Sequence, residues 1–157
     1  MTIMDDLNFL AGKWEGNNLV WESLDQEPYE SKTSAKVTPV AMGKFLRIDY
    51  TWSLENEPQE GSLLVGQEES NQAVSAIWVD SWHNGDKMMA CQGGVETNGS
   101  VNLLGSYAVQ SGPDWGWRIV VEPGGIDSFR IFMYNINPQG VEELAVEADY
   151  RLVGSIP

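Results

Sequence analysis

The sequence has 157 residues, of which 42% are hydrophobic, enough for one domain with a substantial core and too few for two ordinary domains. Its 23 acidic residues against 9 basic ones give a formal net charge of -14, which disfavours nucleic acid and anionic membrane surfaces as partners. The single cysteine, Cys91, excludes an internal disulfide, and no stretch approaches the roughly 18 apolar residues of a membrane helix.

In chain order, the first predicted element is a short N-terminal helical turn. Asp5 or Asp6 can cap a turn that begins at Leu7 and ends at Gly12. The segment Met1–Gly12 has neither the basic region nor the long apolar stretch of a secretory signal. We therefore expect a soluble, cytoplasmic protein.

Two later segments alternate strictly between apolar and polar residues. Between residues 44 and 55 the apolar positions are Leu46, Ile48, Tyr50, Trp52 and Leu54. Between residues 143 and 152 they are Leu144, Val146, Ala148, Tyr150 and Leu152. A period of two predicts strands with one buried face, and burying the opposite faces would bring Arg47, Asp49, Glu147 and Asp149 inside without partners.

Turn signals divide the chain into successive hairpins. They occur at Glu57-Pro58, Asn84-Gly85, Asn98-Gly99, Gly112-Pro113, Gly124-Gly125 and residues 137–140. The runs between them number about ten, and none has the pattern of a crossover helix. The sequence therefore predicts one all-β domain over residues 1–157, an antiparallel up-and-down meander of ten strands that closes into a barrel and so removes its exposed edges.

Aromatic residues are spread over the predicted strands and suggest the lining of an apolar pocket. The seven tryptophans suit either a packed core or contact with a flat or amphipathic ligand. The candidate lining residues are Tyr50, Trp52, Trp78, Tyr107, Trp117 and Tyr150.

Three charged or titratable residues are further candidates. Asp80 shares a strand face with Trp78, so it is either a buried carboxylate that needs a partner or a residue of the strand-end turn. Arg130 would grip a ligand carboxylate if it faced inward and would be an ordinary surface cation otherwise. His83 precedes a turn and is expected to face solvent, and one histidine with one cysteine lacks a usual metal-ligand set. We predict no metal and no cofactor.

The segment from Phe9 to Gly16 resembles the Gly-x-Trp opening of calycin barrels, the superfamily of lipocalins and fatty-acid-binding proteins. With the segments 78–82, 115–118 and 150–152, the chain resembles an uncharacterised bacterial family of lipocalin-like domains of unknown function. The resemblance implies a ten-stranded calycin-like barrel with an internal cavity. It also implies a structural clamp in which Trp14 stacks against Arg151 of the last strand. It implies no activity, because calycins include carriers, haem proteins and enzymes.

These features predict a non-catalytic binding protein for a small apolar or amphipathic molecule held in the barrel interior. Two alternatives stay open. One is a calycin-type enzyme, a lyase or isomerase, that uses Asp80 and Tyr107. The other is a structural module whose barrel is filled by its own side chains and which acts by self-association, for example as a homodimer.

Overall fold

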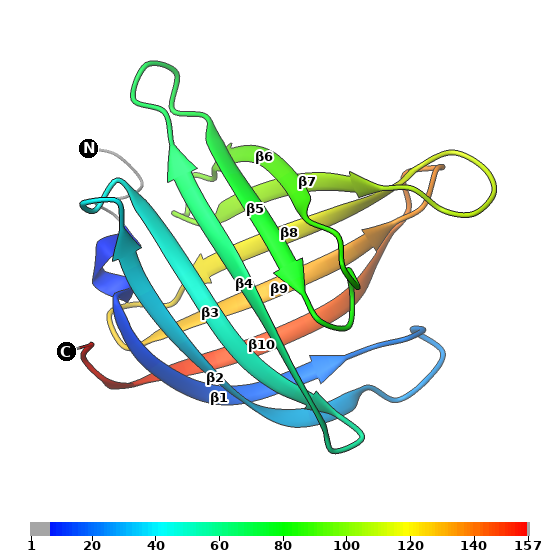
Figure 1. Ribbon diagram of the computed structural model, residues 1–157, viewed down its shortest axis with the longest axis horizontal. Helices are drawn as coiled ribbons and strands as arrows, with labels where there is room; N and C mark the ends of the chain where they lie inside the picture. Colours follow the sequence, from blue (N-terminus) through cyan, green and yellow to red (C-terminus); the bar gives the residue numbers. More distant parts are fainter. Residues whose placement is uncertain (1–6, 157) are drawn as a thin grey trace.

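The computed structural model describes residues 7–156 as a closed barrel of ten antiparallel strands (Figure 1). A 3₁₀ turn, η1 (Asn8–Leu10), precedes the strands, which are β1 (Gly12–Val20), β2 (Tyr29–Val40), β3 (Phe45–Leu54), β4 (Glu57–Gln67), β5 (Val74–Asp80), β6 (Met89–Val95), β7 (Val101–Tyr107), β8 (Trp115–Pro123), β9 (Ser128–Ile136) and β10 (Glu142–Gly154). Each strand pairs with its neighbour in the chain, and β1 pairs with β10. The predicted all-β meander and its closure are confirmed.

The strands alternate in direction, so the connections gather at two ends of the barrel. We call the end with η1 and the β2–β3 turn the closed end. The other end, the mouth, carries the loops 21–28, 55–56, 81–88, 108–114 and 137–141. At the closed end Leu7 and Leu10 are buried, and the carbonyl oxygen of Leu10 accepts a hydrogen bond of 2.8 Å from Trp14 Nε1. The turn η1 therefore covers the core at this end.

The predicted helical turn from Leu7 to Gly12 is not formed as such, since only the three-residue 3₁₀ turn η1 precedes β1 in the described residues and Gly12 already begins that strand. Leu7 occupies its N-cap position and makes no side-chain cap. The predicted caps, Asp5 and Asp6, lie outside the described residues. None of the helices in the described part of the chain is long and apolar enough to cross a membrane.

The alternation predicted for β3 is confirmed, since Leu46, Ile48, Tyr50 and Trp52 are all buried and Leu54 is half-buried. In β10, Val146, Ala148 and Tyr150 are buried as predicted. A register shift between Leu144 and Val146 brings Ala145 into the core as well and leaves Leu144 half-buried. The inward prediction is wrong for Leu152, which is 42% exposed because β10 continues past its last pair with β9.

One predicted turn is displaced. Glu57 and Pro58 begin β4, and the β3–β4 hairpin turns at Glu55 and Asn56, whose φ angles are 48° and 70°. Two positive φ angles fit the tight turns that match the twist of paired strands. Glycine usually takes such angles, so Glu55-Asn56 carries little sequence signal.

The two adjacent glycines of β6 allow a test of how closely this barrel is packed. A Cβ atom at position 93 would lie 1.8 Å from the carbonyl oxygen of Asn102 on β7, whereas one at position 94 would meet nothing within 4 Å. We expect Gly93→Ala to lower the free energy of unfolding by about 3 kcal/mol, because the two backbones would have to separate. Gly94→Ala is the matched control and should stay within about 0.5 kcal/mol. Urea unfolding measures both, and equal stabilities would contradict the close approach of β6 and β7.

Candidate functional site

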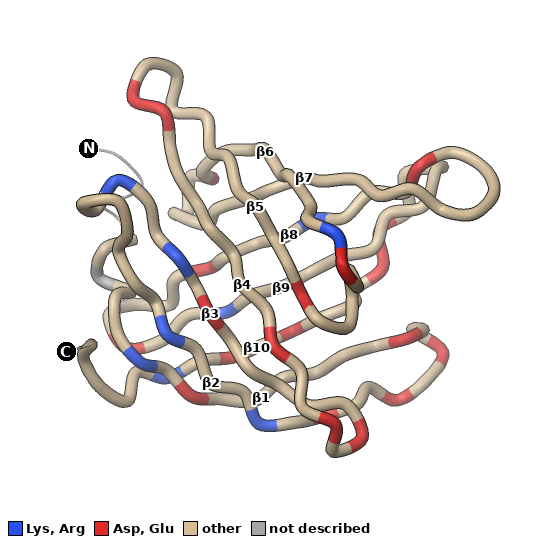
Figure 2. Tube along the Cα trace, viewed as in Figure 1, with Lys and Arg blue, Asp and Glu red and all other residues tan. Residues whose placement is uncertain are grey.

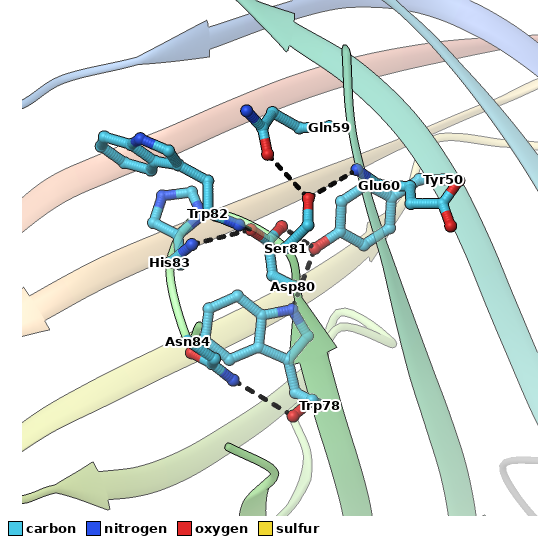
Figure 3. A network of polar contacts seen from close by, with 9 residues as sticks. All are labelled: Tyr50, Gln59, Glu60, Trp78, Asp80, Ser81, Trp82, His83 and Asn84. Carbon is cyan, nitrogen blue, oxygen red and sulfur yellow. Dashed lines mark hydrogen bonds and ion pairs between the residues drawn. The ribbon is translucent and has the colours of Figure 1, made fainter. Parts of the chain in front are cut away.

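The candidate site begins with a row of three residues across neighbouring strands. Tyr50 on β3, Gly61 on β4 and Asp80 on β5 lie opposite one another. A Cβ at Gly61 would lie 2.3 Å from the Tyr50 hydroxyl oxygen, so the missing side chain makes room for the phenol. Tyr50 reaches across and donates a hydrogen bond of 2.7 Å to Asp80 Oδ2, and Trp78 Nε1 donates to the same hydroxyl at 3.0 Å (Figure 3).

The other carboxylate oxygen of Asp80 holds the turn that follows β5. Asp80 Oδ1 accepts hydrogen bonds of 2.9 Å from the backbone N–H groups of Trp82 and His83, and it lies 3.2 Å from His83 Nδ1. Burial alone would raise the pKa of Asp80, but the hydrogen bonds and charge interaction with His83, together with the Tyr50 hydrogen bond, lower it below its ordinary value. Asp80 is thus both a buried carboxylate and a turn residue, and it is ionised at neutral pH.

The turn carries His83 into the mouth of the barrel. The prediction that His83 faces solvent is wrong, since its side chain is only 11% exposed. Its ring lies among four indoles, with centroid distances of 5.5 Å to Trp52, 5.9 Å to Trp78, 4.8 Å to Trp82 and 5.5 Å to Trp117. The physical reason is the pair of backbone hydrogen bonds to Asp80, which bends the chain inward. Alternation along a strand does not predict the direction of a side chain in a turn, so the sequence did not indicate that His83 points inward.

His83 lines three separate spaces. The first is a cavity of about 10 Å³ inside the barrel, with room for about one water molecule; its lining is mostly apolar and also includes the polar residues Asn18, Tyr50, Asp80 and Tyr150. The second is a hollow of about 230 Å³ at the mouth, which we call the tryptophan hollow; its lining includes Trp21, Trp82, Trp117, Glu22 and Glu143. The third, of about 420 Å³, is lined by residues that include Lys87, Met88, Met89 and Tyr107. His83 is therefore the one residue common to the linings of the small interior cavity and of these two larger hollows.

Most of the predicted lining residues are brought together inside the barrel. Tyr50, Trp52, Trp78, Asp80, Trp117 and Tyr150 are all buried. Trp78 and Trp117 stack with a centroid distance of 5.3 Å and an interplanar angle of 10°. Tyr150 shares a hydrogen bond of 3.0 Å with Thr33.

Two of the predicted site residues lie elsewhere. Arg130 is on the outer surface, 53% exposed at its side chain, and pairs with Asp149 at 3.0 Å, so it does not face a ligand inside the barrel. Tyr107 is half-buried and donates its hydroxyl to Asn135 at 2.5 Å. The tyrosine that donates a hydrogen bond to Asp80 is Tyr50. The Asp80–Tyr107 pair of the enzymatic alternative is not formed.

The predicted clamp between Trp14 and Arg151 is also wrong. Trp14 is fully buried and packs edge-on against Phe129 at 4.7 Å, whereas Arg151 is exposed. In the β1–β10 pair Trp14 faces Leu152, and Arg151 faces Glu15 one residue along. Alternation along a strand therefore places the two side chains on opposite sides of the barrel wall.

Among the described residues, no group of three or more His, Cys, Asp or Glu side chains could hold a metal ion. Cys91 is buried, and burial raises the pKa of its thiol to about 11. The thiol is therefore protonated at neutral pH and is a poor nucleophile.

Comparisons with known proteins identify a family and a fold. Residues 5–152 match the model of the family described as "Protein of unknown function (DUF1579)". Among solved structures, the chain is similar to that titled "Crystal Structure of Rv2717c from M. tuberculosis", with 11% sequence identity, a TM-score of 0.63 and coverage of 98% of each chain. At this identity the likeness concerns the fold alone. The comparison with curated proteins gave no match.

The Asp80 network generates a prediction about pH. Replacing Asp80 by Asn should lower the free energy of unfolding at neutral pH by about 1–3 kcal/mol, because the Tyr50 hydroxyl and the backbone N–H groups of Trp82 and His83 lose a charged acceptor. The pKa of Asp80 is lowered on folding, so its stabilisation is present above about pH 4 and is lost as the pH falls through the folded-state value. The difference between the native chain and Asp80→Asn should therefore narrow below about pH 4.

Urea unfolding across the acid range measures this difference. Asp114→Asn, in an exposed loop, is the control and should match the native chain throughout. A gap for Asp80→Asn that keeps its size at the lowest pH where both proteins fold would mean that the carboxylate charge is not the source of the stabilisation.

Proposed function

The chain belongs to the DUF1579 family of proteins of unknown function, and we propose that it is a non-catalytic binding protein for a small amphipathic molecule held at the barrel mouth. The observation that carries the proposal is the pair of hollows that His83 lines at the mouth, with volumes of about 230 and 420 Å³. Their walls combine indole, methionine and tyrosine side chains with a few polar groups, as small-molecule sites do. We place the ligand at the mouth because the interior cavity, at about 10 Å³, is too small for it.

A buried hydrogen-bond donor supports this placement. Trp117 lines the tryptophan hollow and is 6% exposed, yet its indole N–H has no hydrogen-bond partner. Buried donors are nearly always paired in folded proteins, and we propose that an acceptor atom of the ligand pairs with this one.

The calycin resemblance supports the same proposal. The Gly12-Lys13-Trp14 segment lies at the start of β1 in a closed ten-stranded barrel, the position that calycins give to their Gly-x-Trp opening. We propose on this basis that the barrel is calycin-like, with its ligand nearer the mouth than in a carrier with an open interior.

The filled-barrel module remains a second candidate function, and the small interior cavity favours it. If packing is the only role of the aromatic residues, the hollows at the mouth bind nothing and the chain acts through its outer surface. The enzymatic alternative has less support. Asp80 is ionised and already accepts hydrogen bonds from Tyr50, Trp82 and His83, which leaves it poorly placed to donate a proton to a substrate.

Native mass spectrometry of protein purified without denaturation, with an absorbance spectrum, tests for a retained ligand. For protein free of ligand, we expect the neutral dye Nile red to quench the tryptophan fluorescence. Trp82→Ala removes one wall of the tryptophan hollow and should weaken dye binding about tenfold.

Met42→Ala is the control for this experiment, because Met42 is fully exposed at the closed end. Equal dye affinities for the native chain, Trp82→Ala and Met42→Ala would count against the mouth site. No bound mass and no quenching at high dye concentration would favour the filled-barrel module instead.

A further inference from the structure

We infer that the ligand of the tryptophan hollow is an organic ammonium ion that also carries an oxygen acceptor, as an amino alcohol does. This inference rests on the proposed binding function and adds to it the chemical class of the ligand. Three features of the hollow carry it: the sign of its charges, its indole walls and the unpaired donor of Trp117.

The charges around the hollow are negative. Glu22 and Glu143 are the charged residues that line it, and neither lysine nor arginine does. The mouth loops contain six carboxylates, Glu22, Asp25, Glu27, Glu55, Asp86 and Asp114, against the single cation Lys87. Figure 2 shows acidic residues along the β1–β2 and β3–β4 connections, whereas several Lys and Arg residues lie along β1, β2 and β3 toward the closed end. A mouth of one charge sign attracts ligands of the opposite sign and repels carboxylates and phosphates.

The negative charges at the mouth also affect Tyr29, the first residue of β2. The charges of Glu22 and then Glu55 raise the pKa of its phenol, because they disfavour a further negative charge. The carboxylates therefore act together on groups at this rim.

The walls of the hollow suit a cation that is poorly hydrated. Trp21, Trp82 and Trp117 come from the β1–β2 loop, the β5–β6 loop and β8, and they line one space. Indole is the best of the side chains at binding a cation over its ring face, and sets of aromatic rings are the usual receptor for quaternary ammonium groups. Trp117 is held in place by its stacking on Trp78 at 5.3 Å.

A metal ion does not fit the same hollow. The hollow is lined by two carboxylates, and the described residues contain no group of three or more His, Cys, Asp or Glu side chains that could hold a metal ion. Hard metal ions take six or more oxygen ligands and would leave the indoles without a role. The aromatic walls thus select an organic cation over a metal.

The oxygen acceptor follows from the indole N–H of Trp117. This donor is buried and has no hydrogen-bond partner, and it belongs to a residue that lines the hollow, so a ligand atom that pairs with it would have to reach in past the surface of the lining. An ammonium group cannot accept a hydrogen bond, so the partner must be another atom of the ligand. A hydroxyl oxygen a few bonds from the ammonium would meet this requirement.

Three small probes separate these contributions in titrations at low salt. They are choline, its uncharged isostere 3,3-dimethyl-1-butanol, and tetramethylammonium, which keeps the charge and lacks the hydroxyl. We expect choline to bind about tenfold more tightly than the isostere, with an affinity that falls as salt is added.

Matched variants assign each contribution to its residues. The double variant Glu22→Gln, Glu143→Gln should remove the preference for choline over the isostere. The control Glu68→Gln, Glu69→Gln has the same change of net charge in a closed-end loop and should keep that preference. Trp117→Phe keeps a ring and removes the N–H, so it should weaken choline several-fold and leave tetramethylammonium nearly unchanged.

The outcomes distinguish this inference from the function on which it rests. Equal binding of choline and its isostere, or equal loss of preference in both glutamate double variants, overturns the ammonium class while the binding function stands. Equal weakening of choline and tetramethylammonium by Trp117→Phe overturns the oxygen acceptor. If neither these probes nor Nile red binds, the binding function itself fails.

Discussion

Pairing of β1 with β10 is the constraint on which the rest of this structure depends. The two strands remain in register from Trp14 opposite Leu152 to Val20 opposite Val146. They approach so closely at Gly16 that a Cβ there would lie 1.6 Å from the carbonyl oxygen of Asp149. Closure leaves no strand edge unpaired, and it also sets a finite volume for all the inward-facing side chains. Alternation along each strand then decides which residues share that volume.

The shared interior volume is filled by aliphatic and large aromatic side chains, and this explains why the hollows lie at the mouth. Trp14 and Phe129 pack edge-on toward the closed end, while Trp78 and Trp117 stack nearer the mouth. The interior cavity that remains has a volume of about 10 Å³, and its lining includes Tyr50, Trp52 and His83. A ligand larger than water can therefore bind without repacking the core only where the strands end and the loops begin.

The buried carboxylate of Asp80 links the stability of the barrel to the shape of its mouth. A charged group inside a protein needs compensating donors, and Tyr50 supplies one from across Gly61. The remaining donors come from Trp82 and His83, so satisfying the carboxylate also orders the turn that forms part of both hollows. The loops around this turn are acidic, whereas β1, β2 and β3 carry both basic and acidic residues (Figure 2).

The sequence by itself determined the all-β class, the ten-strand meander and the inward face of β3, because alternation and turn chemistry are local properties of a strand. It also identified Tyr50, Trp78 and Asp80 as inward candidates, because every second residue of a strand faces the same side of the sheet. Only the tertiary structure decided that Asp80 meets Tyr50, that His83 turns into the mouth, and that Trp14 and Arg151 lie on opposite sides of the wall. These outcomes depend on the register between strands and on which hydrogen-bond donors lie near the buried carboxylate. Both involve residues far apart in the chain, so no single segment of the sequence determines them.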